Sequence, residues 1–112
     1  MSKNIFLRII DEELPCDKVF ENERILAFKD IAPAAPVHIL IVPKKPLSNI
    51  SEITEADWPL IAEIFVVAND LAKKYNLSEG YRILTNNGPM AGQTVFQLHF
   101  HLIGGCHLGP VA

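Results

Sequence analysis

Residues 95–103 alternate between apolar and polar side chains, a pattern that few folds accommodate. The apolar positions are Phe96, Leu98, Phe100 and Leu102, and the polar positions between them are Gln97, His99 and His101. A period of two predicts a β-strand with one buried face. On the other face, successive polar groups would lie about 6.5–7 Å apart. Such a row of one amide and two imidazoles can bind a phosphate or a metal ion.

The two histidines allow three interpretations from the residues alone. They are solvated groups on an edge strand, or they are ligands of a zinc ion together with Cys106, His107 or His38. In the third, one neutral imidazole attacks a phosphorus atom while a neighbouring imidazolium stabilises the charge that builds on the oxygens. Histidine suits this third chemistry because its ordinary pKa of about 6.5 lies near neutral pH.

Composition predicts one domain covering residues 1–112 and excludes several classes of partner. Hydrophobic residues make up 49% of the 112, enough for a core, and the net charge of −3 leaves no basic footprint for nucleic acid. No segment approaches the length of a membrane span, and no signal peptide is evident. Two cysteines make no disulfide framework, so we expect a cytoplasmic protein.

Periodicity predicts an α+β fold with an antiparallel sheet of about five strands, one short helix and one long helix. We expect the short helix within residues 4–13 and a long helix that begins at Thr54 or Asp57 and runs to Tyr75. We expect strands at residues 18–21, 24–28, 37–42, 81–85 and 95–103. The long helix is apolar around most of its circumference, which predicts that a second copy of the chain covers it.

Several other polar residues carry little information when they are considered singly. His38 lies within an apolar strand, where a histidine bonded to backbone is the commoner case. Asp30 and Asn86 are ordinary turn residues by themselves. Only their combination with the histidine strand points to a function.

In combination, these segments resemble the histidine-triad (HIT) nucleotide-binding family, in particular its Hint-type phosphoramidases. The matching segments follow one another in family order: residues 5–10, 26–31, 36–45, 80–82 and 92–105. The resemblance implies a five-stranded antiparallel sheet that pairs with its twin into a ten-stranded sheet in a homodimer. It also implies a purine nucleoside monophosphate or phosphoramidate as ligand, and no metal or cofactor.

The resemblance also implies a role for each matching residue. His99 corresponds to the nucleophile that attacks the α-phosphorus and forms a covalent nucleotidyl-histidine, His101 to the histidine that binds phosphate oxygens, and His38 to a member of the proton network. Asp30 corresponds to the acid that binds the ribose hydroxyls. The phosphate and leaving-group loop corresponds to Asn86, Gly92, Gln93, Thr94 and Val95, and the apolar purine slot to Ile5, Phe6, Ile9, Phe28 and Ile31.

The sequence departs from the family pattern in two places. The family signature has histidine where this chain has Gln97, at a position that belongs to the proton relay around the nucleophile. Glutamine forms hydrogen bonds but carries no proton at neutral pH. The alternative function is therefore a nucleotide-binding or scaffold protein with weakened catalysis. The tail, residues 106–112, lacks the tryptophan of some eukaryotic members, which leaves the leaving group undefined.

Overall fold

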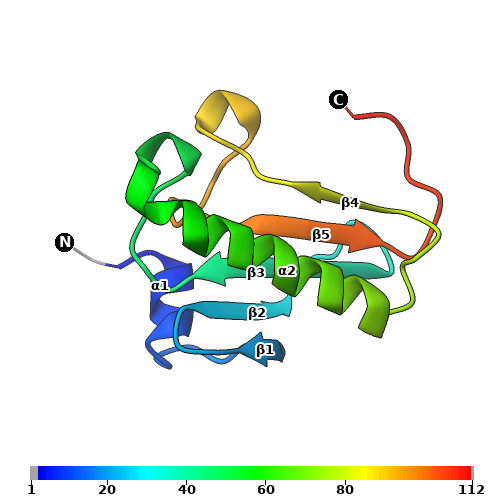
Figure 1. The fold of residues 1–112 in the computed structure, drawn as a ribbon, viewed down its shortest axis with the longest axis horizontal. Helices are drawn as coiled ribbons and strands as arrows, with labels where there is room; N and C mark the ends of the chain where they lie inside the picture. Colours follow the sequence, from blue (N-terminus) through cyan, green and yellow to red (C-terminus); the bar gives the residue numbers. More distant parts are fainter. Residues whose placement is uncertain (1–2, 112) are drawn as a thin grey trace.

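The computed structural model describes residues 3–111 and contains one five-stranded antiparallel sheet (Figure 1). The strands lie in the order β1-β2-β3-β5-β4. The helices and strands, in chain order, are α1 (Ile5–Ile10), β1 (Lys18–Glu21), β2 (Ile25–Lys29), β3 (Val37–Pro43), α2 (Trp58–Lys74), β4 (Tyr81–Leu84) and β5 (Phe100–Gly104). Three 3-10 turns accompany them: η1 (Ile50–Glu52), η2 (Glu55–Asp57) and η3 (Pro89–Ala91). The predicted α+β fold is confirmed.

The two faces of the sheet are covered unequally. Ile25 and Ala27 of β2 face α2 and belong to the main core, whereas Leu26 and Phe28 face the other way and pack with Phe6 of α1. In Figure 1, α2 runs across the front of the sheet, and the much shorter α1 lies at one end. A helix of only six residues covers part of a sheet face. The remainder of that face is therefore free to carry polar side chains.

The long helix begins where Pro59 can be tolerated. The Thr54 backbone N–H donates to Oδ2 of Asp57 at 2.9 Å, which closes the η2 turn. The helix α2 then starts at Trp58, so Pro59 lies in the first turn, where a missing N–H costs nothing. Both predicted starts, Thr54 and Asp57, are therefore used, one for η2 and one for α2.

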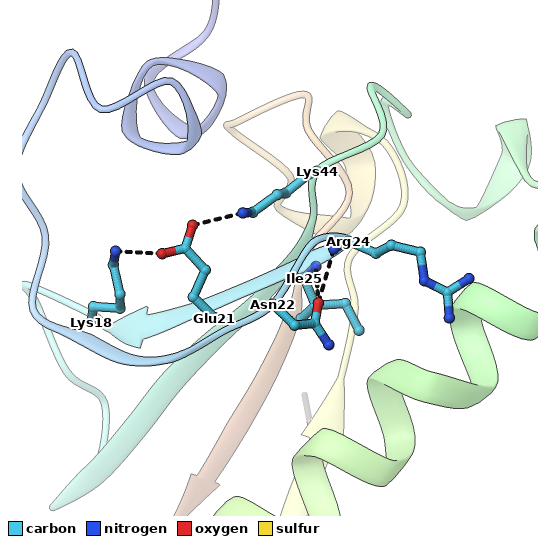
Figure 2. A network of polar contacts seen from close by, with 6 residues as sticks. All are labelled: Lys18, Glu21, Asn22, Arg24, Ile25 and Lys44. Carbon is cyan, nitrogen blue, oxygen red and sulfur yellow. Dashed lines mark hydrogen bonds and ion pairs between the residues drawn. The ribbon is translucent and has the colours of Figure 1, made fainter.

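A side-chain network closes the predicted β1–β2 hairpin (Figure 2). Oδ1 of Asn22 accepts from the backbone N–H groups of Arg24 and Ile25, at 2.9 and 2.8 Å. Glu21 binds Lys18 and, at 2.6 Å, Lys44 in the turn after β3. The hairpin is thereby tied to the segment that follows the central strand.

The predicted strand at residues 95–103 is too long. Only Phe100–Gly104 forms β5, and Phe96, expected in the core, is 42% exposed. The reason lies in the neighbouring strand: β3 ends at Pro43, which has no N–H to donate to a longer ladder, and Pro46 follows shortly after. Leu98, Phe100 and Leu102 do reach the main core, as predicted.

Among residues 3–111, no helix has both the length and the apolar character needed to cross a bilayer.

Candidate active site

Three histidines and one carboxylate gather on the face of the sheet that α1 leaves partly open. His101 of β5 lies opposite Leu40 of β3, and His38 lies two residues before Leu40, so both imidazoles project from the same face. The ring centroids of His38 and His101 are 5.1 Å apart, as are those of His99 and His101. The sequence prediction that His99 and His101 are neighbours is confirmed, and the fold adds His38 and Asp30 to them.

The backbone of the 30–36 loop fixes the protons of His38 and His101. The N–H of Ala34 donates to Nδ1 of His38 at 2.9 Å, so neutral His38 must carry its proton on Nε2. That Nε2 lies 2.9 Å from Nδ1 of His101 and donates to it. His101 in turn carries its proton on Nε2, a buried atom with no hydrogen-bond partner among the described residues. A free N–H donor therefore lies at the end of this series of hydrogen bonds.

His99 carries its proton on the other ring nitrogen. Its Nδ1 lies 2.7 Å from the carbonyl oxygen of Gln97, and because a carbonyl only accepts, Nδ1 carries the proton. The Nε2 atom of His99 therefore keeps its lone pair. The ring of Phe6 packs edge-on against the imidazole with centroids 4.8 Å apart, and Oγ1 of Thr85 donates to the carbonyl of His99 at 2.7 Å. These contacts orient an imidazole whose unprotonated nitrogen can act as a nucleophile.

Burial keeps both of these imidazoles neutral. Desolvation lowers the pKa of His99, and desolvation together with the neighbouring His99 and His38 lowers the pKa of His101 to about 4. The ring beside His99 is therefore a neutral imidazole in this structure, whereas one interpretation of the sequence placed an imidazolium there. At pH 7, His101 offers a neutral N–H donor and His99 a neutral lone pair.

Asp30 lies directly beside the hydrogen bond between His38 and His101. Its Oδ1 accepts from the N–H of Ala32 at 2.8 Å, which fixes the start of the 30–36 loop. Its Oδ2 lies 3.5 Å from Nε2 of His38. The carboxylate is only partly buried, so it can still accept hydrogen bonds from a ligand.

The loop before β5 is organised around Gln93. The side-chain oxygen of Gln93 accepts from the N–H of Gly88 at 2.8 Å, and its amide nitrogen donates to the carbonyls of Ser48 and Val95 at 2.7 and 3.1 Å. Gly92 adopts a φ of +90°, a left-handed conformation that favours glycine. Gln93 is thus a structural residue of the loop, whereas Thr94 is exposed and Asn86 is partly exposed.

The five residues predicted to form the purine slot have different surroundings. Phe6 and Phe28 are buried and pack edge-on with centroids 5.6 Å apart, and Ile9 packs on the same cluster. Ile5 is 47% exposed and Ile31 is 97% exposed. The structure thus brings three of the five into one apolar cluster, with the other two open to solvent.

Gln97 does not share the polar row in which the sequence pattern put it. The residue is 1% exposed, and its amide binds backbone groups of the segment after β3. The prediction fails because the chain at residue 97 lies before the start of β5, so strand alternation does not apply there.

Sequence reasoning missed two contacts that orient the imidazoles: the Ala34 N–H and the Thr85 hydroxyl. An alanine carries no signal of this kind, because its contribution depends on the path of the 30–36 backbone. Thr85 directly follows a predicted strand, but only the fold brings its hydroxyl to the carbonyl of His99.

The histidine and carboxylate atoms also resemble a metal site, since one ligand atom each of Asp30, His38 and His101 lie within 4.8 Å of one another. The hydrogen bond from Ala34 argues against ligation. With Nδ1 of His38 accepting this N–H, metal binding through Nε2 would require an imidazolate. Cys106 and His107, the other zinc candidates, line a surface cavity beside Tyr81 and Arg82.

Comparison with known proteins agrees with this geometry. The family described as "HIT domain" matches residues 11–108. A HIT-like protein of Chlamydia pneumoniae is 46% identical over 108 residues, which cover 96% of this chain and 98% of the relative. The chain belongs to the HIT domain family.

Two solved structures share both fold and sequence with this chain. A HIT family hydrolase from Clostridium thermocellum has a TM-score of 0.94 and 46% identity, with 99% of this chain and 97% of the other covered. A histidine triad nucleotide-binding protein from Candida albicans has a TM-score of 0.83 and 33% identity, with coverage of 98% and 84%.

We predict that the protein binds no stoichiometric zinc through the histidine cluster. Elemental analysis of protein purified without added metal should give far less than one zinc per chain. In calorimetric titrations with zinc chloride, wild type and His38→Asn should behave alike. Stoichiometric binding that is lost in His38→Asn would contradict the tautomer that Ala34 imposes.

We predict that the free energy of unfolding falls as the pH drops from about 6.5 to about 4. Because the pKa of His101 is near 4 in the folded chain and 6.5 for an ordinary histidine, the unfolded chain binds more protons across this window, and acid favours it. The lowered pKa of His99 acts in the same direction. Urea unfolding at pH 7.5, 6 and 5 measures the slope.

The matched variants for this measurement are His101→Gln and His107→Gln. The first should flatten the pH dependence between 6.5 and 4. The second removes an exposed histidine outside the cluster and should keep the wild-type slope. Equal slopes in all three proteins would refute the assignment.

Proposed function

We propose that this protein is a purine nucleoside phosphoramidase that works through a covalent nucleotidyl-histidine on His99. The observation that carries the proposal is that two neighbouring neutral imidazoles differ in their free nitrogen: one has a lone pair and the other has an N–H. Nε2 of His99 has a lone pair, because Nδ1 is bound to the Gln97 carbonyl. The Nε2–H of neighbouring His101 has no hydrogen-bond partner among residues 3–111. A phosphoryl group needs both, a nucleophile at phosphorus and a donor at its oxygens.

The reaction divides into two displacements at phosphorus. In the first, Nε2 of His99 forms a bond to the α-phosphorus while the bond to the amine nitrogen breaks, and the departing nitrogen takes up a proton from solvent. In the second, water attacks phosphorus and releases a proton to solvent, the bond to Nε2 breaks, and the nucleoside monophosphate leaves. The net change is hydrolysis by one water molecule. His101 donates its Nε2–H to a phosphate oxygen throughout, and His38 and Ala34 hold that proton in place.

The remaining site residues would bind the nucleoside. Asp30 can accept from both ribose hydroxyls through the oxygen that Ala32 leaves free. The backbone of the loop at Gly92 and the hydroxyl of Thr94 would meet the phosphate or the leaving group. Phe6, Phe28 and Ile9, with the exposed Ile5 and Ile31, would form the apolar slot for the purine. The described nucleotide binding of the Candida albicans relative supports this class of ligand.

A second candidate is a nucleotide-binding or scaffold protein with weak catalysis. The observation in its favour is that Gln97 replaces the first histidine of the family signature and that its amide is occupied by backbone groups. Under this hypothesis the chain binds nucleotide but lacks an effective proton relay. Restoring a histidine at position 97 would then increase turnover by orders of magnitude.

We predict that His99→Ala lowers the rate of AMP release from an adenosine phosphoramidate by about 10³-fold or more, since the variant lacks the nitrogen proposed to form the covalent intermediate. Steady-state kinetics with chromatographic detection of AMP measures the loss. Calorimetric binding of AMP serves as the control, because Asp30, His101 and the apolar residues remain. Equal turnover by both proteins would remove His99 from the nucleophile position.

We also propose that two copies pair through β4 and the exposed face of α2. Strand β4 lies at an edge of the sheet and can continue hydrogen bonding into a twin. The helix face above it is apolar: Trp58 is 59%, Phe65 44% and Val66 58% exposed. Phe65 packs on Phe100 of β5, and Asn69 binds the hydroxyl of Tyr81 in β4, so this face adjoins that edge.

We predict that the protein sediments as a dimer of twice its 12.5 kDa chain mass and that Val66→Glu converts it to a monomer. A buried carboxylate without a partner would destabilise the interface, whereas the isolated chain already exposes this position. The matched control is Ile50→Glu in η1, which adds the same charge at another partly exposed apolar residue. Sedimentation equilibrium decides, and a monomeric wild type would end the dimer proposal.

A further inference from the structure

Both N–H donors of the Gln97 amide and one lone pair of its oxygen have backbone partners. Its nitrogen donates to the carbonyls of Pro43 and Lys45, at 2.8 and 2.9 Å, and its oxygen accepts from the N–H of Leu47 at 3.3 Å. The side chain is almost completely buried. Since both N–H groups already donate to backbone carbonyls, the amide has no donor left for a phosphate.

These bonds form where the sheet ladder stops. The strand β3 ends at Pro43, and the chain turns through Lys45 to Leu47. The N–H of Leu98 donates to the carbonyl of Leu47 at 2.6 Å, next to the amide of Gln97. Together, the main chain of Leu98 and the side chain of Gln97 fasten the segment before β5 to the 43–47 turn. The Gln97 amide therefore replaces ladder bonds that the proline-containing turn does not form.

The backbone carbonyl of Gln97 also orients His99. The carbonyl of Gln97 accepts from Nδ1 of His99 at 2.7 Å, which leaves Nε2 unprotonated. A carbonyl can select this tautomer only while the backbone at residue 97 keeps its orientation. The three amide bonds fix that backbone from one side, and the Thr85 hydroxyl fixes the His99 carbonyl from the other.

We propose that Gln97 is a positioning residue: its side-chain amide, bound to the 43–47 turn, fixes the Gln97 carbonyl that holds His99 in its nucleophilic tautomer. The inference rests on the proposed function of His99 as nucleophile. Gln97 acts through its own backbone and through His99, and it touches no reacting atom. In this proposal the Gln97 amide has a structural role of its own, whereas the alternative hypothesis treats Gln97 as a proton relay that has lost its function.

This role makes histidine a poorer residue than glutamine at position 97. A neutral imidazole has one donor and one acceptor, so it could satisfy at most two of the three partners at Pro43, Lys45 and Leu47. A buried backbone group would then lose its hydrogen bond, and the segment before His99 would loosen. Gln97→His should therefore lower turnover, opposite to the increase that a missing relay predicts.

The test combines kinetics with direct observation of the His99 tautomer. Gln97→Met keeps the approximate length of the side chain and removes all three bonds, and Gln97→His removes at least one. The matched control is Asn22→Ala, which also deletes side-chain bonds to backbone N–H groups, at the β1–β2 turn (Figure 2). For each protein, kcat and KM for an adenosine phosphoramidate and the ¹⁵N shifts of the His99 ring are measured, with His99→Ala used for assignment.

We expect kcat of Gln97→Met to fall by about 10–100-fold with KM little changed, the effect of a misplaced reacting group. The kcat of Gln97→His should lie between the values for Gln97→Met and wild type. In both, the ¹⁵N spectrum should show His99 losing its single Nδ1–H tautomer, whereas Asn22→Ala should retain wild-type kcat and the wild-type spectrum. If Gln97→Met does not fold, Gln97→His carries the same comparison.

Two results would overturn the positioning role: a wild-type His99 spectrum in a folded Gln97 variant, or a gain in kcat for Gln97→His. Failure of the proposed function looks different, because wild type would then show no AMP release. The His99 spectrum would still report whether the Gln97 amide sets the tautomer.

Discussion

The hydrogen bond from the Ala34 backbone to His38 determines the chemistry of the whole cluster. A backbone N–H is a permanent donor, so it forces the proton of neutral His38 onto Nε2 and, through that atom, the proton of His101 onto its own Nε2. The Gln97 carbonyl, a permanent acceptor, forces the opposite tautomer on His99. Two adjacent imidazoles, with ring centroids 5.1 Å apart, thus carry a donor and a lone pair, and main-chain groups select both states.

This arrangement offers an anion N–H donors and no positive charge. The pKa values of His99 and His101 are both lowered by burial, so neither ring is cationic at neutral pH. The lysines of the turn after β3 are engaged elsewhere: Lys44 with Glu21 (Figure 2) and Lys45 with Asp57. A phosphate would therefore be held by N–H dipoles in a poorly hydrated site, where a neutral donor is effective. The acidic net charge of the chain is compatible with such a site.

The sequence predicted the parts of this protein that local pattern controls. The strands β1 to β4 and the helix α2 follow from apolar periodicity. His99 and His101 are neighbours, as the pattern of residues 95–103 predicted, although His99 lies just before the start of β5. The first half of the predicted last strand failed, because strand formation there depends on donors in a partner far along the chain. Pro43 and Pro46 end that partner, and no pattern within residues 95–99 reports it.

The site shows the same division between local and distant causes. Histidine identity is visible in the sequence, whereas the tautomer of each ring depends on Ala34, on a carbonyl and on the path of two loops. Burial, which lowers the pKa of His101 to about 4, depends on how the sheet face is covered. A sequence pattern therefore identified the histidines of the candidate site, but their protonation states required the fold.

Gln97 illustrates how a departure from a family signature can be accommodated by the backbone around it. The turn after β3 directs two carbonyls, from Pro43 and Lys45, and one N–H, from Leu47, toward a single buried side chain. A primary amide matches that set, whereas an imidazole cannot. The residue at position 97 and the conformation of the 43–47 turn are therefore coupled. A change from glutamine to histidine is compatible with a well-ordered His99 only if this turn also changes, so that one fewer hydrogen bond is needed.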